Sequence, residues 1–186
     1  MRPNVRTSAT RGSSETPTVW CPWHDRRVTT QRPATADDEP FLWELLYESL
    51  YAPPGEPRPS RELLAEPRLG AYVTGFGTRP GDAGIVALDG AAGPVGAVWA
   101  RRRDAADPGY GFVDTTTPEL SIATVDGWRG RGIGGQLLAA LQREIGRCSL
   151  SVDVRNPALR LYTRLGFVRV ADAGDDGHWT MLYDPG

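Results

Sequence analysis

Residues 119–145 read ELSIATVDGWRGRGIGGQLLAALQREI, and this stretch decides the fold. Its first part, Glu119–Val125, alternates in polarity and is rich in β-branched residues, which predicts a half-buried strand. Asp126-Gly127 then breaks the strand. Apolar residues recur at helical spacing after the glycines that follow (Leu137, Leu138, Leu141 and Ile145). The order is therefore strand, glycine-rich loop, helix.

The glycine-rich loop has the features of an anion site. The first turn of a helix carries N–H groups without intrahelical partners, and the helix dipole adds partial positive charge there. Glycines let an anion approach the backbone, so a phosphate or pyrophosphate would fit. A tight turn that needs glycine only for packing is the alternative. Four glycines and two arginines so close together weigh against it (Gly130, Gly132, Gly134 and Gly135, with Arg129 and Arg131).

A dinucleotide-binding fold is a second interpretation of the same loop. Gly130-x-Gly132-x-x-Gly135 fits the dinucleotide fingerprint, and Asp153 lies about 20 residues further on, where a ribose-binding acid would stand. That fingerprint normally follows the first strand of a long doubly wound sheet. Here the loop comes late in the chain and few strands can follow it, so we place this interpretation well behind the next one.

Two motifs in the expected order carry a more specific resemblance. Arg129-x-x-Gly132-x-Gly134 resembles the acyl-CoA signature of the GNAT superfamily of N-acetyltransferases. The run Leu150–Phe167, with Asn156 and Tyr162 inside it, resembles that family's next strand and helix. One departure is that many members carry proline at the position of Asp126 and often valine at that of Thr124.

The resemblance implies an α/β (α+β) fold, namely a mixed, mostly antiparallel sheet of 6–7 strands flanked by helices, with a splayed pair of central strands. It implies acetyl-CoA as cosubstrate and no metal. A bulge in the strand before the loop would separate that strand from the next, and pantetheine would fill the gap. The cofactor-binding residues carried over are Ile122, Ala123, Thr124, Arg129, Gly130, Arg131, Gly132, Ile133, Gly134, Gly135 and Asn156. Asn156 can equally cap the helix after Pro157.

The same resemblance names two catalytic candidates. Tyr162 matches the tyrosine that protonates the departing thiolate, and a phenol and a thiol differ by only about two pKa units; the alternative is an aromatic ring packed between helix and sheet. Glu119 stands where several relatives carry an acid that acts as base, through water. A merely solvated acid at the start of a strand is the alternative there.

The expected activity is acetyl transfer to a primary amine by direct attack, through a tetrahedral intermediate. A non-catalytic acyl-CoA-binding sensor or interaction module is the alternative. The acceptor would be a small-molecule amine or a protein N-terminus, and the sequence names neither the acceptor nor the length of the acyl group. A homodimer is compatible with the sequence.

Composition bounds these expectations. The chain has 186 residues, of which 40% are hydrophobic and 24% charged, as in ordinary globular domains. A net charge of −2 argues against nucleic acid or an anionic membrane as partner. Cys21 and Cys148 lie far apart in sequence, which favours a reducing, cytoplasmic location. Residues 1–27 lack apolar periodicity and are expected to be a disordered extension before a single domain at 28–186.

The rest of the chain gives a coarse outline. Residues 28–32 are expected to form a strand ended by Pro33, and Asp37 or Asp38 to cap a helix that reaches about Leu50. In that helix Trp43, Tyr47 and Tyr51 line one face, either as an acceptor-pocket wall or as a wide buried face. The remaining expectations are a hairpin (84–88 and 94–101), a long loop (102–118), strands at 149–154, 167–170 and 178–183, and a helix at 157–165.

Overall fold

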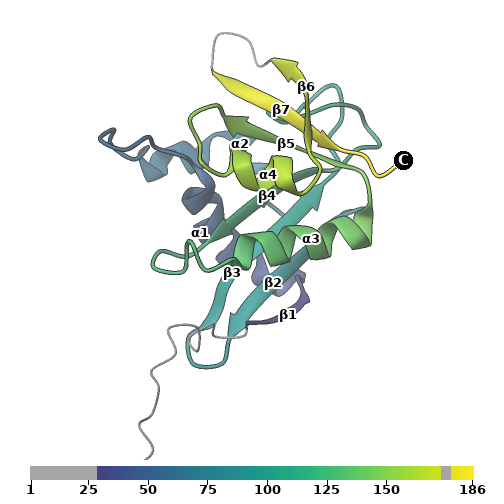
Figure 1. Cartoon of the computed structure of the whole chain (residues 1–186). Helices are drawn as coiled ribbons and strands as arrows, with labels where there is room; N and C mark the ends of the chain where they lie inside the picture. The colour runs from purple at the N-terminus through teal and green to yellow at the C-terminus, as the bar shows by residue number, and fades with distance from the viewer. Residues whose placement is uncertain (1–28, 173–176) are drawn as a thin grey trace, which may run out of the picture.

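A computed structural model describes residues 29–172 and 177–186, and its centre is a seven-stranded sheet. The strands lie in the order β1-β2-β3-β4-β5-β7-β6, and Figure 1 shows the twisted sheet with helices on both sides. All neighbouring pairs are antiparallel except β4 and β5, which are parallel. The strands are β1 (Thr30–Pro33), β2 (Ala83–Asp89), β3 (Gly93–Arg101), β4 (Glu119–Thr124), β5 (Cys148–Asp153), β6 (Val168–Asp172) and β7 (His178–Tyr183). The predicted mixed, mostly antiparallel sheet is confirmed.

Helices cover both faces of this sheet. The helices α3 (Ile133–Ile145) and α4 (Leu159–Arg164) lie in front of it in Figure 1, and α1 (Glu39–Ser49) lies behind. The short helix α2 (Pro67–Gly70) follows a 3-10 turn, η2 (Arg61–Ala65). The long loop between β3 and β4 contains no helix or strand, as its sequence predicted.

The sheet therefore separates two hydrophobic cores. Beneath α3, the fully buried Leu137, Leu138 and Leu141 pack on one face of the sheet, which confirms the leucine stripe expected from helical spacing. Beneath α1, Leu42, Leu45 and Leu46 pack on the other face. Alternate residues of β4 serve the two cores, because successive side chains of a strand point to opposite faces. Leu120 faces α3, whereas Ala123 faces α1.

Two local predictions near the start of the domain need correction. Pro33 is itself the last residue of the first strand, opposite Ile85, rather than the residue that follows it. It is tolerated because β1 is an edge strand, where a missing N–H breaks no ladder. Asp38 occupies the predicted N-cap position of α1, but its side chain makes no capping hydrogen bond to that helix. Its carboxylate instead accepts hydrogen bonds from Arg32 and from the N–H of Thr35, and so closes the preceding 3-10 turn, η1 (Ala36–Asp38).

Residues 1–27, expected to be a disordered extension, and Cys21 lie outside the described residues. Cys148 is a buried free thiol, and burial raises its pKa to about 12. None of the helices in the described part of the chain combines the length and the apolarity needed to span a membrane.

Candidate functional site

The centre of the sheet opens between β4 and β5. On one side, β4 pairs with β3 along its whole length, from Glu119 to Thr124. On the other side, β4 meets β5 at a single residue pair, Glu119 with Ser149. Beyond that pair the two parallel strands diverge, so the free edge of β4 presents unpaired main-chain groups. The predicted splayed pair of central strands is confirmed.

The expected cause of this opening is wrong, however. The register between β3 and β4 runs without a shift from Gly96–Thr124 to Arg101–Glu119, so β4 has no bulge there. None is needed, because β5 leaves the edge of β4 after one pair. This alone frees the main-chain groups that point away from β3, which along Ile122–Thr124 are those of alternate residues.

A cavity of about 860 Å³ occupies the opening. It runs from the glycine-rich loop, past the free edge of β4, to the C-terminal end of α1 and the chain that follows it. The cavity brings together all but one of the predicted cofactor-binding residues, together with the predicted acid: Ile122, Ala123, Thr124, Arg129, Gly130, Gly132, Ile133, Gly134, Gly135, Asn156 and Tyr162. Arg131 is not among the lining residues.

The glycine-rich loop ends in an accessible helix N-terminus. Gly130 and Gly132 have φ angles of 75° and 82°, a backbone region that favours glycine, and α3 begins directly afterwards at Ile133. A Cβ atom on Gly134 would meet its nearest neighbours, Ile122 and Leu161, at an ordinary 3.8 Å. Packing therefore does not require glycine at position 134. The free N–H groups of the first turn suit a phosphate, as predicted.

The two arginines of the loop are engaged within the protein. Arg129 donates to the main-chain oxygen of Glu48 at 3.1 Å and to its carboxylate at 2.7 Å, and so ties the loop to the end of α1. Arg131 stacks over the ring of Trp128, with 4.5 Å between the guanidinium carbon and the ring centroid. Arg129 thus borders the cavity as an anchored residue, which the sequence did not reveal.

Asn156 orders the turn before α4 and retains donors for a ligand. Its Oδ1 accepts a hydrogen bond from the N–H of Ala158 at 2.9 Å, which closes an Asx turn. The residue before α4 is Ala158, and no side chain caps the helix, so Asn156 does not have the expected capping role. Within residues 29–172 and 177–186, its side-chain NH₂ group makes no hydrogen bond. Since Asn156 lines the cavity, that group remains available there.

Tyr162 lines the cavity from α4 and is 8% exposed. Its ring contacts Phe167 edge-on, with centroids 6.0 Å apart. No described residue makes a hydrogen bond to its hydroxyl. Burial raises the pKa of Tyr162 to about 12, so the hydroxyl keeps its proton at neutral pH. An ordinary thiol has a pKa of about 8.5. The difference in pKa between Tyr162 and such a thiol is therefore larger than the two units expected from the sequence.

Glu119, the predicted base, is neither solvated nor beside the cavity. It is 3% exposed, and its Oε1 accepts hydrogen bonds from the Tyr72 hydroxyl at 2.5 Å and from the N–H of Gly111 at 2.6 Å. Gly109 lies against Oε2, because a Cβ atom there would come within 1.7 Å of that oxygen. Burial raises the pKa of Glu119, and the hydrogen bond from Tyr72 opposes that rise.

The segment Gly109–Gly111 therefore seals Glu119, and the sequence argument missed both this contact and Tyr72. Arg68 holds the segment from outside, by hydrogen bonds to Pro108 and Gly109 and by stacking on Tyr110. The sequence did contain one signal of this contact, namely Tyr110 between two glycines in a loop that leads directly into β4.

Of the aromatic row Trp43, Tyr47 and Tyr51, only Tyr51, which follows α1, reaches the cavity. Tyr51 lines it and donates from its hydroxyl to the main-chain oxygen of Arg155. The ring of Tyr47 instead lies against the guanidinium groups of Arg58 and Arg61, each 4.4 Å from the centroid. Tyr47 therefore holds the loop that follows α1, whereas Tyr51 borders the site.

No cluster of three or more metal-ligating side chains occurs in the described part of the chain. A glycine loop at a helix N-terminus, a split between parallel strands and a buried tyrosine surround one cavity, and these features suit an acyl donor that carries a phosphate group.

Comparison with known proteins agrees with this class. Residues 80–169 match the family model described as acetyltransferase (GNAT) domain. This segment is identified as a GNAT acetyltransferase domain, the domain of an acyltransferase enzyme, and solved structures of similar fold agree. A comparison with curated proteins gives no significant match.

Solved structures of similar fold include three acetyltransferases. A protein assigned to the GnaT family from Bordetella pertussis is 25% identical, with a TM-score of 0.55 over 84% of this chain and 99% of that one. A phosphinothricin acetyltransferase from Sinorhizobium meliloti, solved with AcCoA, is 24% identical, with a TM-score of 0.55 over 85% and 90%. The yncA protein from Salmonella typhimurium, solved with acetyl-CoA, is 20% identical, with a TM-score of 0.59 over 86% and 95%.

Proposed function

We propose that this protein is an N-acetyltransferase that moves the acetyl group of acetyl-CoA to a primary amine by direct attack, through a tetrahedral intermediate. The observation that carries the proposal is the single cavity that joins the glycine loop, the free edge of β4 and the Tyr162 side chain. These parts correspond to the three needs of acyl transfer, which are donor binding, carbonyl polarisation and protonation of the leaving group.

Acetyl-CoA fits the donor end of the cavity. The first turn of α3 offers N–H groups for the pyrophosphate, and Gly134 leaves space for it to approach. The pantetheine arm carries amides, which can pair with the free edge of β4 at Ile122–Thr124 and with the amide of Asn156. Two structures of similar fold were solved with acetyl-CoA, which supports the same donor here.

The chain's own residues would then act on the thioester. An N–H of Ile122–Thr124 would polarise the acetyl carbonyl, because this edge has no strand partner beyond Glu119. The Tyr162 hydroxyl would protonate the departing sulfur. Burial raises the pKa of that hydroxyl, but a thiolate in the same dry cavity is also more basic than in water, so proton transfer stays feasible.

For the proton that the amine loses, we assign Glu119 as the acceptor. Burial raises the pKa of Glu119, so that it lies closer to the pKa of an amine than the pKa of an ordinary glutamate does. Because Glu119 does not line the cavity, the proton must pass through at least one further group. The Tyr72 hydroxyl, bonded to Glu119, is the nearest candidate in the described structure.

The test combines binding and turnover. Acetyl-CoA should raise the melting temperature by mass action, and NADH should not. A panel of small amines and short peptides, followed by the release of free CoA thiol, should then give turnover with at least one class. Tight acetyl-CoA binding without acetylation of any amine would favour the sensor alternative. A response to NADH instead of acetyl-CoA would reject both.

A further inference from the structure

A buried arginine, Arg103, follows β3 and is incompletely paired. Its side chain is 2% exposed, and its ion pair is with Asp107, whose own side chain is 60% exposed. The Nε of Arg103 has no hydrogen-bond partner in the part of the chain that the structure describes. A buried cation is costly unless an opposite charge is buried with it, and the Asp107 carboxylate stands mostly in water.

Glu119 is the matching buried anion. Its Oε2 likewise lacks a hydrogen-bond partner within residues 29–172 and 177–186. Tyr72 contacts both charged residues. Its hydroxyl donates to Oε1 of Glu119, and its ring centroid lies 5.3 Å from the guanidinium carbon of Arg103. The two opposite charges therefore share one neighbour in a region that excludes water, where their attraction acts beyond hydrogen-bond distance.

Two other arginines approach Glu119, but each is engaged elsewhere. Arg101 stands opposite Glu119 in the register between β3 and β4, and it is paired with the buried carboxylate of Asp82. Arg68 is exposed and stacks on Tyr110, so water and salt screen its charge. Neither is placed as well as a buried cation that lacks a buried partner.

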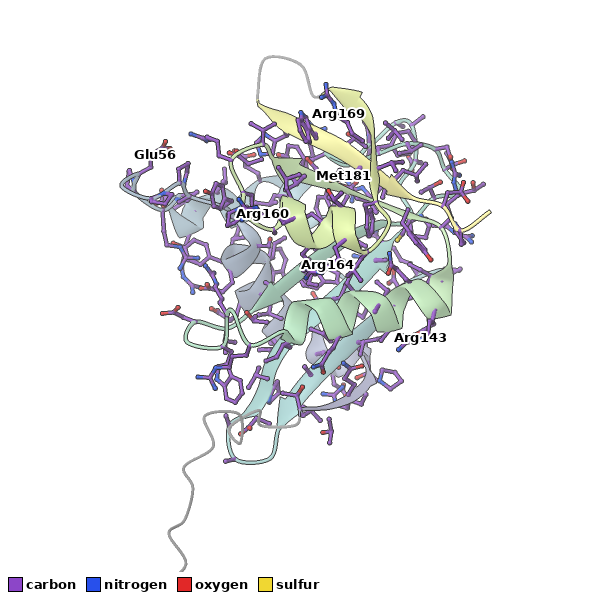
Figure 2. The ribbon with its side chains drawn as sticks, viewed as in Figure 1. Glu56, Arg143, Arg160, Arg164, Arg169 and Met181 are labelled. Carbon is purple, nitrogen blue, oxygen red and sulfur yellow. The ribbon has the colours of Figure 1, made fainter. Side chains whose placement is uncertain are left out.

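The arginines of α3 and α4 belong to the other side of the sheet. Figure 2 shows Arg143 and Arg164 on those helices, in front of the sheet. Leu120 faces α3, so its neighbour Glu119 points to the opposite face, where Tyr72 belongs to the core beneath α1.

We propose that Arg103 is a positioning residue for the reaction: its guanidinium group is the counter-charge that keeps Glu119 ionised, and it acts on the acceptor amine only through that carboxylate. The inference rests on the proposed function, in which Glu119 accepts the proton of the amine. A carboxylate can accept a proton only while it is ionised, and burial works against that form. Burial raises the pKa of Glu119, and the charge of Arg103 is among the influences that oppose the rise.

The first test measures the charge of Glu119 and needs no acceptor. The full chain, carrying isotope-labelled glutamate, is titrated by carbon NMR, and the signal of Glu119 is the one missing from Glu119→Gln. Arg103→Met removes the charge and leaves a side chain that suits burial, so the Glu119 midpoint should move to higher pH by about one pH unit or more. Arg103→Lys keeps the charge and should stay much closer to wild type.

Arg102→Met is the matched control, because it removes the same charge from the exposed arginine next in the chain. It should leave the Glu119 midpoint where wild type has it. An unchanged midpoint in Arg103→Met would overturn the inference and leave the proposed function standing. If Arg103→Met does not fold, the double variant with Glu119→Gln decides. It should regain a cooperative melting transition, and failure to do so would overturn the inference.

The second test follows turnover on a confirmed acceptor. The fall of kcat at low pH should begin at higher pH in Arg103→Met than in wild type or Arg102→Met. Acetyl-CoA affinity should stay unchanged, because Arg103 does not line the cavity. A loss of kcat that is equal at every pH would indicate a merely structural role and overturn the inference. A shifted NMR midpoint with an unmoved kcat profile would overturn the assignment of Glu119 as base, and with it any part of Arg103 in the reaction.

Discussion

The two ends of β4 can be compared directly, because they belong to one short strand. At Ile122–Thr124 its free edge opens into a cavity of about 860 Å³. Three residues earlier, Glu119 is buried under the loop from β3, with one carboxylate oxygen bonded to Tyr72 and Gly111. The open end presents main-chain groups without partners to a cavity, whereas the sealed end is enclosed by the protein and bonded to it through Oε1. The first arrangement suits a ligand, and the second holds a loop in place.

The largest expected effect is at the open end. Tyr162→Phe should lower kcat by roughly 10²–10⁴-fold on a confirmed acceptor, because it removes a general acid. Acetyl-CoA affinity should hardly change, since the ring remains. The melting temperature should also stay close to that of wild type, because the hydroxyl bonds to no described residue. Steady-state kinetics and calorimetry on one preparation test this; loss of acetyl-CoA binding with an intact fold would make the hydroxyl a donor contact instead.

The next effect concerns the glycine loop. Gly134→Asp should weaken acetyl-CoA binding by on the order of 100-fold or more, because it places a negative charge beside the pyrophosphate. Gly134→Ala is the control, since a Cβ there meets its neighbours at 3.8 Å. Thermal shift with saturating acetyl-CoA distinguishes them. A normal shift in Gly134→Asp would mean that the pyrophosphate lies elsewhere.

At the sealed end, a substitution should cost stability rather than binding. A Cβ atom on Gly111 would lie 2.5 Å from the main chain at Leu150, so Gly111→Ala should reduce the free energy of unfolding by about 2–3 kcal/mol. Gly90→Ala, where nothing lies within 4 Å of the new atom, should have almost no such effect. Urea denaturation gives both values. Equal urea midpoints for the two variants would show that the loop around Gly111 does not pack against β5.

The smallest effect is the response to alkaline pH. The ordinary pKa of tyrosine is 10.0, and burial raises that of Tyr162 to about 12. The unfolded chain therefore releases this proton first, and stability that is complete below pH 10 is lost as pH rises toward 12. Tyr162 alone should account for about 1 kcal/mol by pH 11.

Tyr162→Phe should remove that part of the pH dependence in melting curves between pH 9 and 11. At the sealed end, burial and the charge of Glu119 raise the pKa of Tyr72 further. Its absorbance change should therefore appear only on unfolding. If Tyr72 ionised at a lower pH than Tyr162, the sealed end would not be the more buried and more negatively charged of the two.

Local patterns in the sequence predicted most of the framework. The leucine spacing of α3, the turn residues between β2 and β3, and the motif residues around Asn156 all act through near neighbours in the chain, so the sequence shows them directly. The opening between β4 and β5 was also expected, although through a bulge that β4 does not have.

Two features of the site that the sequence did not reveal depend on contacts between distant parts of the chain. Tyr72 and Glu119 are 47 residues apart, and Arg129 and Glu48 are 81 apart. No local pattern marks such pairs. A glutamate at the start of a strand looks solvated until the loop above it is placed, and an arginine in a glycine loop looks free until the end of α1 is beside it.

The unpaired edge of β4 also bears on how such a protein can change over generations. In the proposed function, peptide groups rather than side chains at Ile122–Thr124 meet the donor. Exchanging one apolar side chain for another there would leave those groups in place. The surface that meets the donor can therefore outlast extensive drift in sequence, and the three structures compared above share only 20–25% of their residues with this chain over more than four fifths of its length.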